Sequence, residues 1–520
     1  MSAIVTDQFR VLNSENFVKS VQDPNNSYYV FLGLANPSSV GFGRTSNWDS
    51  TIPSPTDNFN YLNHVKDTIL FGKRITSDNV RRLIRKVQWS KNTIYEMYRH
   101  DYSVQNPSPK TSSYRLYDAN YYVVNKDYRV YLCIDNGSKS TNRLGNPSQD
   151  EPLFVDLEPS RAGESGDGYL WKYLFTVSPS DIVKFDSIEY IPVPENWSST
   201  NDADIKSIRT SGDSLVNENQ IKKVYIENAG TGYNSSTESL DIIGDGEGAK
   251  VIVDVVGGRI NDVLVSSGGK NYTYGRVDLS PINQGATSFA HLIPVIPPSR
   301  GHGYDIYSEL GCERVLIYAR FDDSTKDFPT DIKFAQIGII KNPTIAGSAS
   351  STYYDTTFSN LYSLKLNENT VSSPQLAIPG NKIFQSITGV GTATGYIASY
   401  DPETKVLKYF TDRSLYFNDL SYDQKDSKTV FTQSSPIGFS TSGGLITTSD
   451  GFSAAIDPSF QESDLFISNS KSIDLNTNFV NGISTPEINK RSGEIIYIDN
   501  RPIVNRNPKQ KEDIKIVLEF

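Results

Sequence analysis

Short apolar segments separated by clusters of turn residues run through most of this sequence and constrain its fold more than any other feature. The separating clusters are rich in Asn, Asp, Gly, Ser and Pro, which favour turns, while the segments are rich in β-branched and aromatic residues. Clear examples are Tyr121–Val124, Tyr128–Ile134 and Arg314–Arg320. The pattern predicts a mainly β, multi-domain protein of sandwich-like or barrel-like modules with a few short helices.

Two segments are predicted to be helical. From about Asp78 to Val87, apolar residues recur at the spacing of one helix face, and Thr76 or Ser77 would cap the first turn. A shorter helix is expected over Glu15–Val21.

The predicted helix over 78–87 places four basic residues opposite its apolar face: Arg81, Arg82, Arg85 and Lys86. The default interpretation of such a stripe is a solvated helix surface. As candidate partner-interface residues they would suit an acidic protein partner better than nucleic acid, because the chain has a formal net charge of −10.

A repeat occurs at an offset of 39 residues and indicates one compact β-module built by duplication. Each copy reads as a strand, a Gly-rich turn that carries a Tyr, and a second strand. The matched positions are Ile221, Val224, Ile226, Gly230, Tyr233 and Leu240 in the first copy, and Ile260, Val263, Val265, Gly269, Tyr272 and Leu279 in the second. Two copies are too few for a solenoid.

A second β-module is predicted from a hairpin signal, in which Gly395–Tyr400 and Val406–Phe410 flank a polar loop. Both modules read as insertions into a host fold. The predicted domains are an N-terminal part of the host over 1–205, the duplicated module over 206–290, a middle part over 291–375, the second module over 376–485, and closing strands over 486–520.

Composition excludes several classes of protein. The chain has 520 residues with 31 Tyr and 24 Phe, an aromatic content that a disordered chain lacks. No apolar run approaches the ~18 residues of a membrane span, and the first residues do not resemble a secretory signal. Cys133 and Cys312 suggest no disulfide framework, so we expect synthesis in a reducing cytoplasm.

No motif predicts catalysis, a metal site or a cofactor. Gly163–Gly168 superficially resembles the serine environment of chymotrypsin-like proteases, but it lacks the matching His context, and a turn is expected instead. The glycine-rich runs 244–248 and 389–395 lack the following helix of a phosphate loop and are expected to be β-turns. His302 is expected to make a local hydrogen bond, with Asp305 as a nearby partner, rather than to bind a metal.

Five ordered blocks resemble the baseplate wedge protein encoded by gene eight of T-even-type contractile-tailed phages. They are Ala3–Arg10, Gly166–Phe175 with Glu189–Pro194, Phe334–Pro343, Ser492–Pro502, and Ile514–Phe520. The first resembles that family's opening strand, and the last two resemble its closing strands. The resemblance covers about 1–200, 291–345 and 486–520, which leaves the two predicted insertions outside it.

The resemblance implies a non-enzymatic, mainly β virion component that forms a homodimer in the tail baseplate. Its expected partners are other wedge proteins resembling the products of genes six, seven and ten, with no nucleic acid or membrane. Trp171 and Tyr173 alternate with Phe175 along one predicted strand, which suits a packed core or a permanent interface. Glu494–Ile498 reads as a central strand.

A second hypothesis from a different class is a tail-associated protein that binds or cleaves glycans. Its candidate contact residues are the tyrosines of the two β-modules: Tyr233, Tyr272, Tyr396 and Tyr400. The alternative interpretation of these rings is packing in the core or against turns.

Overall fold

The chain is mainly β in the computed structural model, with 39% of residues in strands and 13% in helices, which confirms the predicted fold class. The structure describes residues 5–35, 48–210, 220–235, 237–283, 285–322, 333–411, 437–462, 464–467, 471–474, 478–504 and 511–520. The helices in these ranges are α1 (Asp7–Gln22), α2 (Phe59–Thr68), α3 (Pro179–Phe185), α4 (Ala203–Thr210) and α5 (Ile306–Glu309).

The chain divides into two compact units, and each is assembled from separate stretches of sequence. Unit 1 comprises Met1–Val18, Arg81–Leu316 and Val517–Phe520. Unit 2 comprises Lys19–Val80 and Ile317–Ile516. The predicted boundaries of the inserted modules are finer than this division and stay predictions.

Unit 1 contains a three-stranded antiparallel sheet in the order β4–β5–β6, formed by β4 (Tyr122–Val124), β5 (Arg129–Asn136) and β6 (Tyr169–Thr176). Large aromatic side chains fill the core beside this sheet. Each wholly buried ring removes a large apolar area from water, which stabilises the core. Among them, Tyr169 and Trp171 stack with ring centroids 5.0 Å apart.

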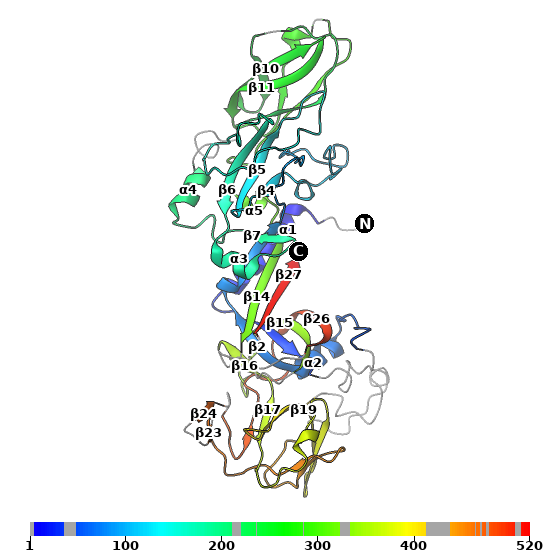
Figure 1. The fold of residues 1–520 in the computed structure, drawn as a ribbon, viewed down its shortest axis with the longest axis vertical. Coiled ribbons are helices and arrows are strands. Elements are labelled where there is room, and N and C mark those ends of the chain that lie inside the picture. The colour runs from blue at the N-terminus through cyan, green and yellow to red at the C-terminus, as the bar shows by residue number, and fades with distance from the viewer. Residues whose placement is uncertain are drawn as a thin grey trace. The chain divides into compact units, whose positions relative to one another are not determined.

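The repeat region of unit 1 forms two small sheets. One has the order β11–β10–β9–β12 and consists of β9 (Leu240–Gly244), β10 (Glu247–Val256), β11 (Arg259–Lys270) and β12 (Gly275–Val277). The other pairs β8 (Val224–Asn228) with β13 (His291–Pro294). Figure 1 shows β10 and β11 as two long adjacent green strands.

The packing of this region accounts for the residue types at the repeated positions. The apolar and tyrosine positions of both copies lie in or against one hydrophobic cluster. The matched glycines, Gly230 and Gly269, both have positive φ, at 60° and 63°. A Cβ at Gly230 would lie 2.6 Å from the ring of Tyr233, and one at Gly269 would lie 2.5 Å from the backbone nitrogen of Ala249. Only glycine tolerates both the conformation and the close approach.

Unit 2 contains a five-stranded sheet and a seven-stranded sheet. The first has the order β16–β2–β1–β15–β26, and its strands are β1 (Tyr28–Gly33), β2 (Ile69–Ile75), β15 (Phe334–Lys341), β16 (Thr357–Ser359) and β26 (Glu494–Val504). The second has the order β22–β21–β18–β19–β20–β17–β25, and its strands are β17 (Tyr362–Lys365), β18 (Lys382–Ile387), β19 (Gly391–Asp401), β20 (Val406–Phe410), β21 (Ile446–Thr448), β22 (Ser453–Ala454) and β25 (Ile483–Ser484). β23 (Asp464–Ile467) pairs with β24 (Lys471–Asp474).

The predicted hairpin of the second module is present, because β19 and β20 pair antiparallel. The seven-stranded sheet also includes β17, so it begins on the N-terminal side of the boundary predicted at 376.

A further sheet has the order β27–β14–β3–β7, with the strands β27 (Lys511–Glu519), β14 (Arg314–Asp322), β3 (Val80–Arg85) and β7 (Tyr190–Pro192).

The helix predicted over 78–87 is wrong, since Val80–Arg85 is strand β3. A strand covered on both faces can place buried residues at helix-like spacing, and here Leu83 and Ile84, on opposite faces, are both buried. Thr76, one of the two predicted cap residues, instead precedes a single 3₁₀ turn over Ser77–Asn79, and its backbone N–H donates to Asn79 Oδ1 at 3.1 Å.

Two other expectations need correction, and one is extended. Within the block that resembles an opening strand, Asp7–Arg10 is helical and begins α1. The helix expected over Glu15–Val21 lies inside this longer helix. Glu494–Ile498 belongs to β26, which is an outer strand of the five-stranded sheet rather than a central one.

Candidate functional site

The four basic candidates of the interface lie on or just after strand β3, and each has partners within unit 1. Arg81 pairs with Asp181 at 3.1 Å and with Glu195 at 2.9 Å. The guanidinium carbon of Arg82 lies 3.2 Å from the centroid of the Tyr307 ring. These contacts hold the two side chains inside the unit, so they do not form a solvated stripe.

Arg85 and Lys86 are engaged in the same way. Arg85 Nη2 donates to the carbonyl oxygen of Ala119 at 2.7 Å. Lys86 Nζ lies 2.8 Å from both carboxylate oxygens of Asp186. The basic residues therefore connect β3 to neighbouring segments of unit 1, and each charge already lies against a carboxylate, a carbonyl oxygen or an aromatic ring.

Trp171 and Tyr173 lie on β6. Trp171 is wholly buried, so within this chain its ring belongs to the core and offers no surface to a partner. Tyr173 is half-buried against the same cluster. The alternation along the strand is interrupted because Val130 lies opposite Phe175 while Tyr131 lies opposite Tyr173, which leaves Leu174 as an extra residue in β6.

The four tyrosines considered for glycan contact are all buried: Tyr233, Tyr272, Tyr396 and Tyr400. The hydroxyl groups of two of them hydrogen-bond to the backbone of neighbouring segments. The Ala290 backbone N–H donates to the Tyr233 hydroxyl at 2.8 Å, and the Tyr272 hydroxyl donates to the Ile242 carbonyl at 2.9 Å. Their burial favours the packing interpretation.

The remaining motifs of the sequence lie where turns were expected. Ser165 is exposed in a loop, and its backbone N–H donates to Asp150 Oδ2 at 2.9 Å. The glycine-rich run 244–248 connects β9 to β10, and the run 389–395 lies between β18 and the start of β19 and continues into that strand.

His302 makes a local hydrogen bond, but with a different partner from the one expected. Its Nδ1 lies 2.5 Å from Glu309 Oε1, and both side chains are buried. The other oxygen of Glu309 accepts from the Gly303 backbone N–H at 2.7 Å. Asp305 instead caps α5, accepting from the Tyr307 backbone N–H at 3.1 Å.

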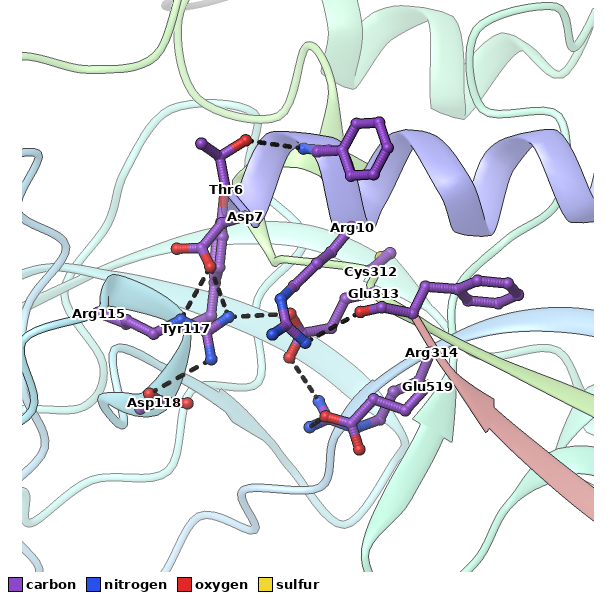
Figure 2. Close-up of polar contacts among 12 residues, drawn as sticks. Thr6, Asp7, Arg10, Arg115, Tyr117, Asp118, Cys312, Glu313, Arg314 and Glu519 are labelled. Atoms are coloured by element: carbon purple, nitrogen blue, oxygen red, sulfur yellow. Dashed lines mark hydrogen bonds and ion pairs between the residues drawn. The ribbon is translucent and has the colours of Figure 1, made fainter. Parts of the chain in front are cut away.

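A cluster of charged residues around Arg115 joins distant segments of unit 1 (Figure 2). Arg115 Nη2 lies 2.6 Å from Asp7 Oδ1 at the start of α1 and 2.9 Å from Glu313 Oε2 just before β14. Asp118 lies further away, at 3.7 Å. One guanidinium thus links three parts of the sequence that are far apart along the chain.

The same cluster includes the last residues of the sequence. Arg314 bridges Glu313 at 3.2 Å and Glu519 at 2.6 Å, and Arg10 Nη1 donates to the carbonyl oxygen of Phe520 at 3.0 Å. Figure 2 shows these side chains converging from α1, β14 and β27. The cluster therefore holds Glu519 and Phe520, the last residues of unit 1, against α1 and the start of β14.

Burial and charge act in opposite directions on Arg115. Burial alone would lower the pKa of its guanidinium, but the hydrogen bond to Asp7 and the nearby charges of Glu313 and Asp118 raise this pKa overall. Arg115 therefore stays charged. Sequence reasoning missed the cluster because its members share no local spacing.

The described residues also bear on metal sites, membrane spans and reactive thiols. No group of three or more His, Cys, Asp or Glu side chains in the part of the chain that the structure describes could hold a metal ion. Among the described residues, no helix is long and apolar enough to cross a membrane. Cys133 and Cys312 are both buried and unbridged, and burial raises the pKa of the Cys312 thiol to about 12.

Neither a comparison with protein families nor a search of curated proteins finds a match for this sequence.

Proposed function

We propose that this chain is a structural subunit of the baseplate wedge of a contractile phage tail. In this role it joins neighbouring wedge proteins and helps to hold the baseplate before the sheath contracts. The observation that carries the proposal is the resemblance in five ordered sequence blocks, spread from the beginning to the end of the sequence.

The positions of these blocks in the fold support a scaffold role. Gly166–Phe175 supplies most of β6 beside the aromatic core, and Phe334–Pro343 supplies all of β15. The last two blocks supply most of β26 and β27. Four of the five blocks thus contribute strands to the sheets, whereas the first contributes the start of α1. Resemblance in framework elements is what a common scaffold would produce, since these residues pack together while loops vary.

The linkage around Arg115 also suits a part that bears load. It joins α1, the start of β14 with the residue before it, and the last residue of β27 by charge-assisted hydrogen bonds. Cross-links between distant segments make local opening of the chain ends costly, because several partners must be released together.

The proposal includes a homodimer and contacts with wedge proteins resembling the products of genes six, seven and ten, without an enzymatic activity. The four tyrosines of the glycan alternative are buried, so that alternative has no support from those rings. The assembled protein would be located in the baseplate of the virion.

Mass spectrometry of purified virions, followed by electron microscopy with an antibody against this chain, tests the proposal. We expect the chain among the virion proteins and the antibody label at the baseplate. Light scattering on the purified chain should give twice the mass of one copy. Absence from the virion, or a label elsewhere on the particle, would refute the baseplate role.

A further inference from the structure

A pocket of about 530 Å³ lies in the repeat region, between the end of β9, β12 and the segment before β13. Its volume falls within the roughly 300–1,000 Å³ of small-ligand sites. The lining residues that matter here are Ile243, Tyr274, Phe289, Arg276, Asp278 and Asn283.

Large apolar side chains around this pocket are exposed to water. Tyr274 is 64% exposed, Phe289 is 76% exposed and Ile243 is 61% exposed. A single exposed apolar residue is ordinary on a protein surface, whereas three around one hollow mark a place where a ligand can cover them. The two rings offer flat apolar faces.

Both aromatic residues are carried by backbone that other side chains hold in place. The Asp245 carboxylate accepts hydrogen bonds from the backbone N–H of Thr273 at 2.9 Å and of Tyr274 at 3.2 Å, and from the Thr273 hydroxyl. The Tyr233 hydroxyl accepts from the backbone N–H of Ala290, next to Phe289. The rings are therefore presented by backbone segments that hydrogen bonds hold in place, which lowers the entropy cost of binding.

The polar part of the lining is balanced in charge. Arg276 and Asp278 are the only charged side chains among the described lining residues. Hydrogen bonds from Ser280 and, less strongly, the charge of Arg276 lower the pKa of Asp278, so the pair is ionised with no net charge. Together with Asn283, they offer both hydrogen-bond donors and acceptors.

We propose that this pocket binds a neutral oligosaccharide. A sugar ring presents C–H groups on one face, which suit the rings of Tyr274 and Phe289, and hydroxyls at its edge, which both donate and accept. A phosphorylated ligand would bring negative charge that a balanced lining does not compensate. A peptide strand would need an edge to pair with, and β12 has only 3 residues.

Among the described lining residues, Tyr233 is the one member of the four buried tyrosines predicted from the sequence, and its hydroxyl accepts a hydrogen bond from the backbone N–H of Ala290. The exposed rings of the site, Tyr274 and Phe289, were not among those candidates. The site also does not depend on the baseplate role. If the protein is found outside the baseplate, the pocket can still bind glycan. If the pocket binds no glycan, the protein can still be a baseplate subunit.

The test begins with the full chain on an array of neutral oligosaccharides, sialylated and sulfated oligosaccharides, and random peptides. We expect binding to neutral oligosaccharides. Calorimetry with the strongest neutral binder then compares Tyr274→Ala and Phe289→Ala with the unaltered chain. Each substitution should weaken binding about tenfold, since each removes one stacking face.

Leu264→Ala is the matched control, because Leu264 is 66% exposed on β11 of the same sheet and does not line the pocket. It should leave the affinity unchanged. The exposure of Tyr274 and Phe289 means that their replacement leaves the hydrophobic cluster in place, which thermal unfolding can verify. Binding only to acidic glycans or to peptides, no binding at all, or binding that both substitutions leave intact would overturn the proposal.

Discussion

Replacing Arg115 with methionine removes the guanidinium at the centre of the charged cluster while keeping much of its apolar stem. The substitution takes one partner away from Glu313, whose side chain is only 2% exposed. Glu313 keeps Arg314 at 3.2 Å, so its charge stays partly compensated. Asp7 at the start of α1 loses its ion pair with Arg115.

The expected cost follows from these contacts. Leaving a buried charge without any partner costs about 3–5 kcal/mol. The cost here should be smaller, because Arg115 is itself 29% exposed and Arg314 remains beside Glu313. We therefore expect Arg115→Met to lower the free energy of unfolding by about 1–3 kcal/mol.

Urea unfolding followed by tryptophan fluorescence measures this change, because Trp171 and Trp197 are buried in the core of unit 1. A double-mutant cycle of Arg115→Met with Glu313→Gln should give a coupling energy of about 1–2 kcal/mol.

Asp118→Asn is the control for the cycle. Asp118 lies 3.7 Å from Arg115 and is 50% exposed, so its replacement should change the free energy of unfolding by less than about 0.5 kcal/mol. If Arg115→Met costs no more than this control, or if the coupling to Glu313 is zero within error, the cluster does not stabilise unit 1 as argued.

Three further predictions concern the core, the repeat and one turn. Trp171→Ala should cost about 3–5 kcal/mol in unfolding experiments, whereas Trp171→Phe should cost less than about 2 kcal/mol, because the buried indole N–H has no hydrogen-bond partner to lose. Gly246→Ala should lower the melting temperature, since a Cβ there would lie 2.4 Å from the ring of Tyr272; an unchanged melting temperature would contradict this packing. Hydrogen bonds, chiefly from Thr273, lower the pKa of Asp245 to about 2. A depressed carboxyl pKa stabilises the turn above the pKa of a free aspartate and stops doing so as the pH falls through about 2. Hydrogen exchange at Thr273, corrected for its intrinsic rate, should therefore show equal protection at about pH 7 and about pH 4. Protection lost by pH 4 would count against this stabilisation of the turn by Asp245.

Much of the secondary structure could be predicted from the sequence, because strand and turn preferences act over a few residues. The segments Tyr121–Val124, Tyr128–Ile134 and Arg314–Arg320 correspond closely to β4, β5 and β14. The exception over 78–87 shows the limit of this reasoning. Periodicity assumes that one face is buried, and the assumption fails for a strand such as β3 that has buried residues on both faces.

The candidate site could not be predicted in the same way. Arg81 and Lys86 were identified by their charge, but the structure gives them the partners Asp181 and Asp186, each 100 residues away in sequence. An ion pair depends on the distance between two side chains in space, and a sequence does not contain that distance. The exposure of a side chain also depends on the folded structure, since Tyr233 is buried while Tyr274 lies at the surface.

By itself, the sequence determined that this chain is mainly β, and it marked the duplicated core positions, because both properties are written in local residue choice and spacing. Only the tertiary structure decided which side chains face water and which charges meet. Arg115 joins residue 7 to residue 313, and Arg10 holds residue 520, through contacts that exist only once the chain has folded. The physical reason is that burial and Coulomb attraction depend on proximity in space, which chain folding creates between residues far apart in sequence.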